Sequence, residues 1–182
     1  MSKRSLDIVL KDQSVYLDTR IRLRIAIDIA KGLNFLHTLN PPVLHRDLKT
    51  ANCLCNDHLE VKLADFGLAK LRDQNFSTNT IATVRYMAPE FIAKQVFGIK
   101  SDIFSFGMIL WELFSRKEPF EELNPTQALY AIAVGKRPEI PKDMPDELRD
   151  VVIRCWDQDA NLRPDCSQIL QRLTEIKEKF TY

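Results

Sequence analysis

The stretch from residue 102 to residue 115 limits the fold of this chain more than any other part of the sequence. Nine of its fourteen residues are large and apolar, and on a helix they leave almost no polar face. A helix that is apolar all round has to lie in the centre of its domain. The stretch is too short to span a membrane, and it contains Glu112. We therefore predict a buried central helix over 102–115, capped by Ser101, in a soluble domain.

A second long helix is expected before this one. Asp18 is a good helix cap, and apolar residues follow it at every fourth position: Ile21, Ile25, Ile29 and Leu33. Four further residues widen this apolar stripe: Ala26, Ala30, Phe35 and Leu36. We expect this helix to be buried on more than one side. It should end before Asn40-Pro41-Pro42, because proline cannot donate the backbone hydrogen bond that a helix needs.

The rest of the sequence completes a single, mainly helical domain. Helical patterns cover four more stretches: 5–11, 125–134, 147–156 and 167–179. Two short alternating runs, 53–55 and 60–64, flank Asn56-Asp57-His58 and read as a β-hairpin. With 182 residues and no internal repeat or linker, the chain is one domain's worth of sequence. The predicted fold is mainly α, a helical bundle around a buried central helix with short β-hairpins beside it.

Charge and cysteine content narrow the classes of function. The formal net charge is +1, which gives no reason to expect binding to nucleic acid or to a membrane surface. The four cysteines form no Cys-x-x-Cys pair, and we expect them to be reduced thiols in the cytoplasm. A zinc site from Cys53, Cys55 and His58 is conceivable, but the alternating spacing suits a strand better.

Three short strings carry the chemistry of this sequence: His45-Arg46-Asp47-Leu48-Lys49-Thr50-Ala51-Asn52, Asp65-Phe66-Gly67 and Ala88-Pro89-Glu90. Each string alone is weak evidence, because short strings occur by chance. A chance occurrence of all three in this order is improbable. Phosphoryl transfer needs an acid for the proton of the incoming hydroxyl, an amide and a second acid for Mg²⁺, and a cation for the phosphate.

With these strings the chain resembles the large, C-terminal lobe of a eukaryotic protein kinase. Lys49, two places after Asp47, is typical of serine/threonine kinases, and Cys155-Trp156 with Arg163-Pro164 is similar to the tyrosine-kinase-like branch. The resemblance therefore implies a kinase that transfers the γ-phosphate of ATP to serine or threonine hydroxyls of proteins. Dual specificity stays open.

The resemblance also assigns roles to residues. It implies that Asp47 orients the substrate hydroxyl, that Lys49 contacts the transferred phosphate, and that Asn52 and Asp65 bind Mg²⁺ with the nucleotide. It places Leu54 under the adenine ring, although ordinary core packing explains a leucine there equally well.

The resemblance also implies that further residues help to hold the geometry of the site: His45, Phe66, Gly67, Thr83, Glu90, Asp102 and Arg163. Thr83 is expected to tie the substrate-binding loop to Asp47 and Lys49, and Glu90 to pair with Arg163. Asp102 is expected to accept backbone N–H groups of the catalytic turn. A simple helix N-terminal acid would account for the same residue type.

Residues 68–87 are polar, rich in serine and threonine, and correspond to a kinase activation loop. Arg46 could pair with a phosphate placed on Ser77, Thr78 or Thr80, by an upstream kinase for example. The alternative is that these are ordinary loop hydroxyls, which contact solvent and accept no phosphate.

The sequence departs from the family pattern in three places. Ala82 stands where glycine is usual, and Phe104 stands where tryptophan is common. More seriously, the five glycines cannot form a glycine-rich loop, and no strand lysine precedes Asp47. We therefore interpret 1–182 as a large lobe without the small lobe.

Two hypotheses follow from this interpretation. One is a serine/threonine kinase whose fragment is weak or inactive alone. The other is a non-catalytic scaffold or competitor that binds substrates or a related kinase. In either case we expect an exposed apolar surface near Leu54 and Phe66 that promotes self-association.

Overall fold

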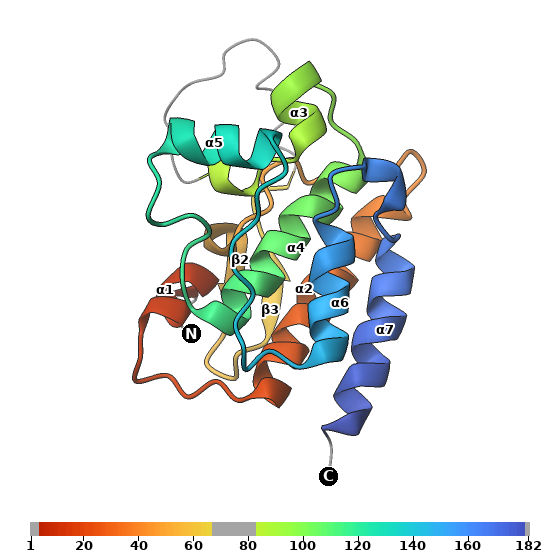
Figure 1. Cartoon of the computed structure of the whole chain (residues 1–182). Helices are drawn as coiled ribbons and strands as arrows, with labels where there is room; N and C mark the ends of the chain where they lie inside the picture. The colour runs from red at the N-terminus through yellow and green to blue at the C-terminus, as the bar shows by residue number, and fades with distance from the viewer. Residues whose placement is uncertain (1–3, 67–82, 181–182) are drawn as a thin grey trace.

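A computed structural model describes residues 4–66 and 83–180 of the chain (Figure 1). The helices are α1 (Leu6–Lys11), α2 (Thr19–His37), α3 (Pro89–Lys94), α4 (Ile99–Ser115), α5 (Pro125–Ala133), α6 (Asp146–Cys155) and α7 (Cys166–Lys179). The strands are β1 (Arg4–Ser5), β2 (Cys53–Cys55) and β3 (Val61–Leu63). Single 3-10 turns are η1 (Thr50–Asn52), η3 (Val84–Tyr86) and η4 (Ala160–Leu162). The mainly α fold class is confirmed.

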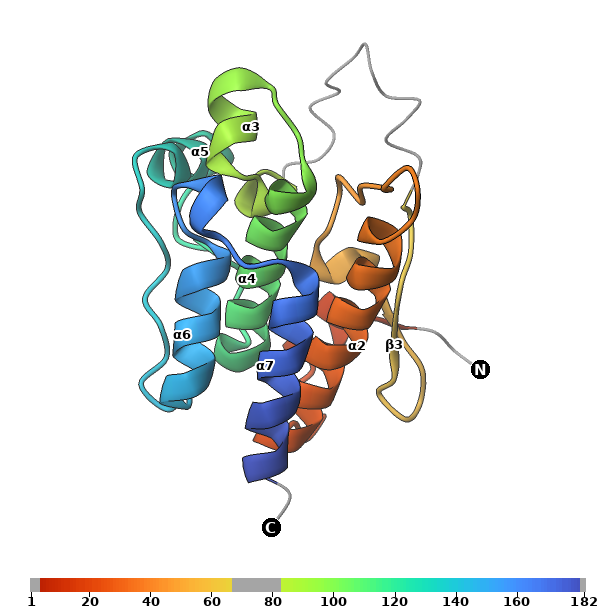
Figure 2. The same ribbon diagram turned by 90° about the vertical axis from the view of Figure 1, so that its right-hand side faces the viewer.

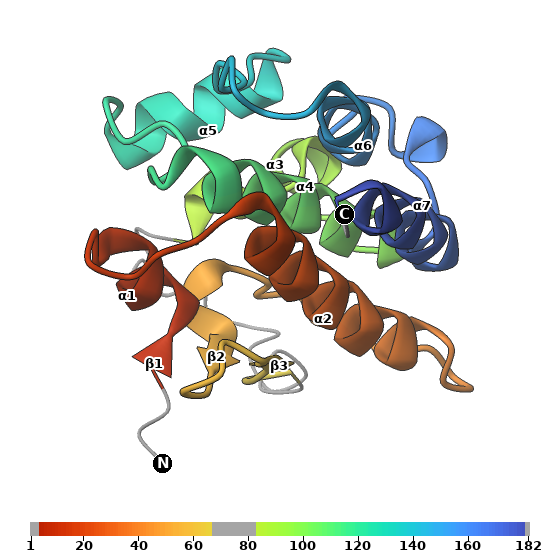
Figure 3. The same ribbon diagram turned by 90° about the horizontal axis from the view of Figure 1, so that it is seen from below.

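Helix α4 lies in the middle of the molecule, as its sequence predicts (Figures 1 and 3). Fourteen of its seventeen residues are buried. Its predicted start was wrong, because the helix begins at Ile99 and not after Ser101. Gly98, in an extended conformation, takes the cap position, and the Ser101 hydroxyl accepts a hydrogen bond from the Gly98 N–H at 3.1 Å. Ser101 therefore supports the first turn of the helix from inside it.

Helix α2 packs beside α7 on one side and against β3 on another (Figure 2). The side chain of Asp18 caps it by accepting the Ile21 N–H at 2.7 Å, as predicted. One residue assigned to the buried stripe was placed wrongly, because Phe35 is 64% exposed. It lies on the outer face of α2 with Asp28 and Lys31, at helical spacings of three, four and seven residues.

The predicted hairpin is present, and a third strand extends it. Strand β2 pairs antiparallel with β3, with Cys53 opposite Leu63. Strand β1 adds to the other edge of β2, with Arg4 opposite Cys55. His58 is exposed in the turn whereas Cys53 and Cys55 are buried, so these three side chains form no zinc site.

Arg116 follows the last turn of α4 in a left-handed conformation, and its guanidinium binds the loop after α1. It donates hydrogen bonds to the carbonyls of Leu10 (3.0 Å), Asp12 (2.6 Å) and Val15 (3.0 Å). Helix α1 leaves its last carbonyls without helical partners, and Arg116 supplies donors for them. Among the residues described, no helix has the length and apolar character needed to cross a membrane.

Candidate active site

The turn that carries the string 45–52 is attached to the start of α4 by one carboxylate. Asp102 is completely buried, and it accepts the backbone N–H groups of His45 at 2.9 Å and Arg46 at 3.0 Å. The ring of His37, at the end of α2, lies 2.8 Å from the same carboxylate. Arg46 adopts a left-handed backbone conformation with φ 64°, which two hydrogen bonds to a fixed carboxylate help to hold. Asp102 thus fixes the turn to two helices.

Asp47 lies at the centre of a small polar cluster beside this turn. Its carboxylate is 3.1 Å from the Lys49 ammonium, and it accepts hydrogen bonds from the Thr83 hydroxyl at 3.1 Å and the Asn52 amide at 3.0 Å. Lys49 also donates to the Thr83 hydroxyl at 2.7 Å. The predicted catalytic acid, lysine, amide and threonine therefore lie together, although Thr83 is more than thirty residues from the others.

Asp65 lies on the same side of the molecule as the cluster around Asp47. The N–H of its neighbour Ala64 donates to the backbone carbonyl of Asn52 at 2.9 Å, and the Asn52 side chain contacts Asp47. Asp65 is exposed and has φ 58°, so its carboxylate faces solvent at this junction. The amide nitrogen of Asn52 donates to the carboxylate and to the backbone carbonyl of Asp47, and the atom of an amide that can bind a metal ion is its oxygen. One amide oxygen and one exposed carboxylate suit Mg²⁺, which usually takes few protein ligands and keeps several waters.

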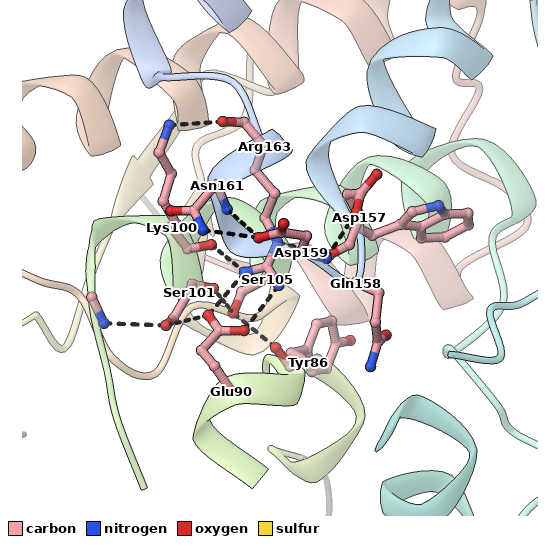
Figure 4. Close-up of polar contacts among 12 residues, drawn as sticks. Tyr86, Glu90, Lys100, Ser101, Ser105, Asp157, Gln158, Asp159, Asn161 and Arg163 are labelled. Carbon is pink, nitrogen blue, oxygen red and sulfur yellow. Dashed lines mark hydrogen bonds and ion pairs between the residues drawn. The ribbon is translucent and has the colours of Figure 1, made fainter. Parts of the chain in front are cut away.

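Glu90 and Arg163 form a bidentate ion pair (Figure 4). Two guanidinium nitrogens of Arg163 lie 2.9 Å from the two carboxylate oxygens of Glu90, and the Arg163 side chain is fully buried. Ser101 donates a further hydrogen bond to Glu90 at 2.7 Å. Burial alone would raise the pKa of Glu90, but the hydrogen bonds from Arg163 and Ser101 outweigh it and lower the pKa. The first turn of α3 is thereby joined to the segment between η4 and α7.

Phe104, at the position where the family often has tryptophan, packs beneath this pair. The guanidinium of Arg163 lies 5.1 Å from the centre of its ring, and that of Arg137 lies 4.9 Å from it. The phenyl ring of Phe104 therefore makes cation–π contacts with both guanidinium groups.

The structure adds a residue that the sequence analysis missed. Glu112 is buried in α4, where its carboxyl group accepts hydrogen bonds from the Tyr86 hydroxyl at 2.6 Å and the Thr50 hydroxyl at 3.2 Å. Burial raises the pKa of Glu112 to about 8. The group links the catalytic turn, through Thr50, to the 3-10 turn that follows Thr83. Its only sequence signal is an acid within the apolar run that follows Asp102 in α4.

Other predicted residues lie at the edges of this site or outside the described part of the chain. Leu54 is half-buried in β2, and Phe66 is 50% exposed. The ring of His45 is buried, and burial lowers its pKa. Four predicted residues fall outside the described residues: Gly67, Ser77, Thr78 and Thr80. The same is true of Ala82.

The sequence is similar to a family of known proteins. Residues 1–173 match the family model described as protein tyrosine and serine/threonine kinase. Two relatives from Arabidopsis thaliana are the serine/threonine-protein kinases STY46 (42% identical, 86% of this chain, 27% of the relative) and CTR1 (41% identical, 88% of this chain, 20% of the relative). The dual specificity protein kinase shkC of Dictyostelium discoideum is 37% identical over 96% of this chain and 36% of its own length. The chain thus spans about a third or less of the length of these relatives.

Proposed function

Since the chain belongs to the protein tyrosine and serine/threonine kinase family, we propose that its two catalytic turns form the lower half of a phosphoryl-transfer site. The reaction is transfer of the γ-phosphate of ATP to serine or threonine hydroxyls of protein substrates. The observation that carries this proposal is the Asp47 carboxylate held at once by Lys49, Asn52 and Thr83. Positioning and charge stabilisation account for most of the catalysis in such sites.

In this proposal each side chain of the cluster has one task. Asp47 accepts or orients the proton of the incoming hydroxyl, and its three contacts fix the direction of its carboxylate. The Lys49 ammonium lies within 3.1 Å of that carboxylate and supplies positive charge for the phosphate. Asn52 and Asp65 hold Mg²⁺, which offsets the charge of the nucleotide phosphates when it is bound. Leu54 packs against the adenine ring from below.

Serine/threonine specificity is supported by Lys49 and by the names of STY46 and CTR1, whereas shkC is called a dual specificity kinase. We further propose regulation by an upstream kinase through Ser77, Thr78 or Thr80, with Arg46 as the partner of the phosphate. A cytoplasmic location is supported by four free, buried cysteines.

We also propose that residues 1–182 act as a large lobe that a small lobe completes. The supporting observation is an open groove of about 370 Å³ between α2 and β3, whose lining combines exposed apolar residues, Phe35 (64% exposed) and Phe66 (50% exposed), with charged ones such as Lys31. A polypeptide of these residues alone exposes this groove, and we expect it to self-associate there. The same exposed groove supports a second candidate function, a non-catalytic scaffold or competitor that binds substrates or a related kinase.

Calorimetric titration with ATP and Mg²⁺ tests the metal role of Asp65. Asp65→Asn should weaken the Mg²⁺-dependent part of ATP binding by roughly tenfold or more, because a neutral amide attracts a divalent cation less than a carboxylate does. Asp57→Asn is the matched control, since Asp57 is an exposed acid in the turn between β2 and β3. Equal binding by the wild-type chain and Asp65→Asn, including no binding by either, would refute a metal role for Asp65.

A further inference from the structure

Helix α5 is the only helix among the described residues that contains no charged side chain, yet one of its faces is exposed. Its inner face, with Ala128, Ala131 and Ile132, packs against η3 and α3. Its outer face carries Tyr130, which is 68% exposed, and Val134 just past the helix end is 52% exposed. Because these two residues are four apart, they lie next to each other on one side of the helix.

An uncharged outer face is unusual for a surface helix. A surface helix normally places polar and charged side chains toward water. In this chain 28% of residues are charged, so eleven positions from 125 to 135 would on average hold about three charges, and they hold none. Helix α4 is also poor in charge, but it is buried, whereas α5 lies at the periphery of the molecule (Figure 3). The outer face of α5 therefore has the composition of a contact surface.

The charges at the two ends of this face are opposite in sign. Glu121 and Glu122 are exposed in the loop before α5, and Lys136 is exposed in the loop after it. Within the part of the chain that the structure describes, none of these three side chains has an ion-pair partner. The neighbouring Arg137 is already engaged, with the Trp156 carbonyl and the Gln158 side chain, both at 2.8 Å.

We propose that the outer face of α5 binds the same face of a second copy of this chain, with the two helices antiparallel about a twofold axis. The midpoint of residues 122 and 136 is residue 129, next to Tyr130. In the proposed arrangement, the loop that carries Glu121 and Glu122 in each chain faces the loop that carries Lys136 in the other chain, and the two Tyr130 rings lie near the axis. A twofold contact requires a surface that is complementary to itself. A surface with an apolar centre and opposite charges at its two ends meets this requirement.

The contact is small, and this determines its strength. One nine-residue helix is about 13 Å long, so a pair of them buries much less than the roughly 1,200–2,000 Å² of a standard stable interface. The expected dimer is therefore weak and reversible. Figure 3 shows α5 on the side of α4 opposite to β2 and β3, so this surface is separate from the groove that contains Phe66.

Sedimentation equilibrium from about 10 µM to about 1 mM tests the proposal. All variants carry Phe66→Ser, so that association through the other groove does not interfere. The Phe66→Ser chain, which is the parent of the other variants, should show a monomer–dimer equilibrium. Adding Tyr130→Glu should raise the dissociation constant of the dimer at least about tenfold, because two carboxylates would meet at the axis. Tyr16→Glu is the matched control, since Tyr16 is 77% exposed and lies outside α5, and it should change nothing.

Charge exchange tests the antiparallel arrangement separately. Glu122→Lys and Lys136→Glu should each weaken the dimer, and the double variant should restore it, because the pairs are re-formed with reversed signs. Far-ultraviolet circular dichroism checks that each variant is folded, which is expected because all substituted side chains are exposed. A parent that stays monomeric throughout, a dimer indifferent to Tyr130→Glu, or a double variant no better than the single ones would overturn the proposal.

Discussion

The Asp102 carboxylate shows how one buried side chain can set the shape of a catalytic turn. Its contacts with the backbone of His45 and Arg46 were expected from the resemblance to protein kinases, whereas the residue type alone was equally consistent with a helix N-terminal acid. The contact with the His37 ring was not expected, because His37 precedes Asp102 by 65 residues and no local pattern marks it. A buried carboxylate needs several hydrogen-bond partners at once, and here the catalytic turn and His37 at the end of α2 supply them.

Glu112 differs from Asp102 because burial governs its protonation. Its pKa in the folded chain is about 8, well above the ordinary value of 4.5, so the folded state holds a proton that the unfolded state releases as pH rises. The titration of Glu112 therefore does not change the free energy of unfolding below about pH 4.5. It lowers this free energy progressively between about pH 4.5 and about pH 8.

Replacing Glu112 by glutamine should remove this pH dependence. Glutamine keeps an oxygen for the Tyr86 hydroxyl but does not ionise, so Glu112→Gln should gain stability relative to the wild-type chain as pH rises toward 8. Urea unfolding at several pH values between 5 and 8 measures the difference. A difference between the two proteins that stays constant with pH would contradict the assigned pKa. Asp150→Asn, an exposed acid on α6, serves as the control.

At the scale of elements, the long helices and the hairpin of β2 and β3 were predictable, whereas strand β1 and the exposure of Phe35 were not. Fourteen buried residues of α4 follow from a composition that leaves no polar face. Strand β1 was missed because two residues, Arg4 and Ser5, form a strand only by pairing with β2 some fifty residues later. Phe35 was misplaced because an apolar residue on a helix predicts burial, whereas β3 leaves a groove open beside it. Non-local packing decided each of these cases.

Arg116 gives a prediction at the same scale. Lysine has one nitrogen in place of three, so Arg116→Lys should lose two or more of the hydrogen bonds to the loop after α1 and cost about 1–3 kcal/mol of stability. Hydrogen exchange should become faster across α1 and remain unchanged in α7. Arg20→Lys, at an exposed position on α2, is the control. Unchanged protection of α1 would show that other contacts hold this helix.

At the scale of the whole molecule, the described residues form a packed helical body, and the polar cluster around Asp47 is largely buried in it. The site needs elements that these 182 residues do not include, a glycine-rich loop over the phosphates and a strand lysine. The polypeptide of residues 1–182 should therefore show little or no transfer of radiolabelled phosphate from ATP to a protein substrate. Loss of one preorganised electrostatic group commonly lowers turnover about 100- to 1,000-fold, and here several are lacking. Turnover at roughly 1–100 per second, the usual range for kinases, would contradict this account.

The most direct test of the central claim, that the turns around Asp47 and Asp65 form one nucleotide and metal site, is paramagnetic broadening of amide signals by Mn²⁺ with ATP. Mn²⁺ accepts the same oxygen ligands as Mg²⁺ and broadens the signals of nearby nuclei. The account predicts that amides of Asp47, Asn52 and Asp65 broaden first, and that Asp65→Asn reduces the effect on all three. Broadening confined to other parts of the chain, or of Asp65 without Asp47 and Asn52, would contradict it.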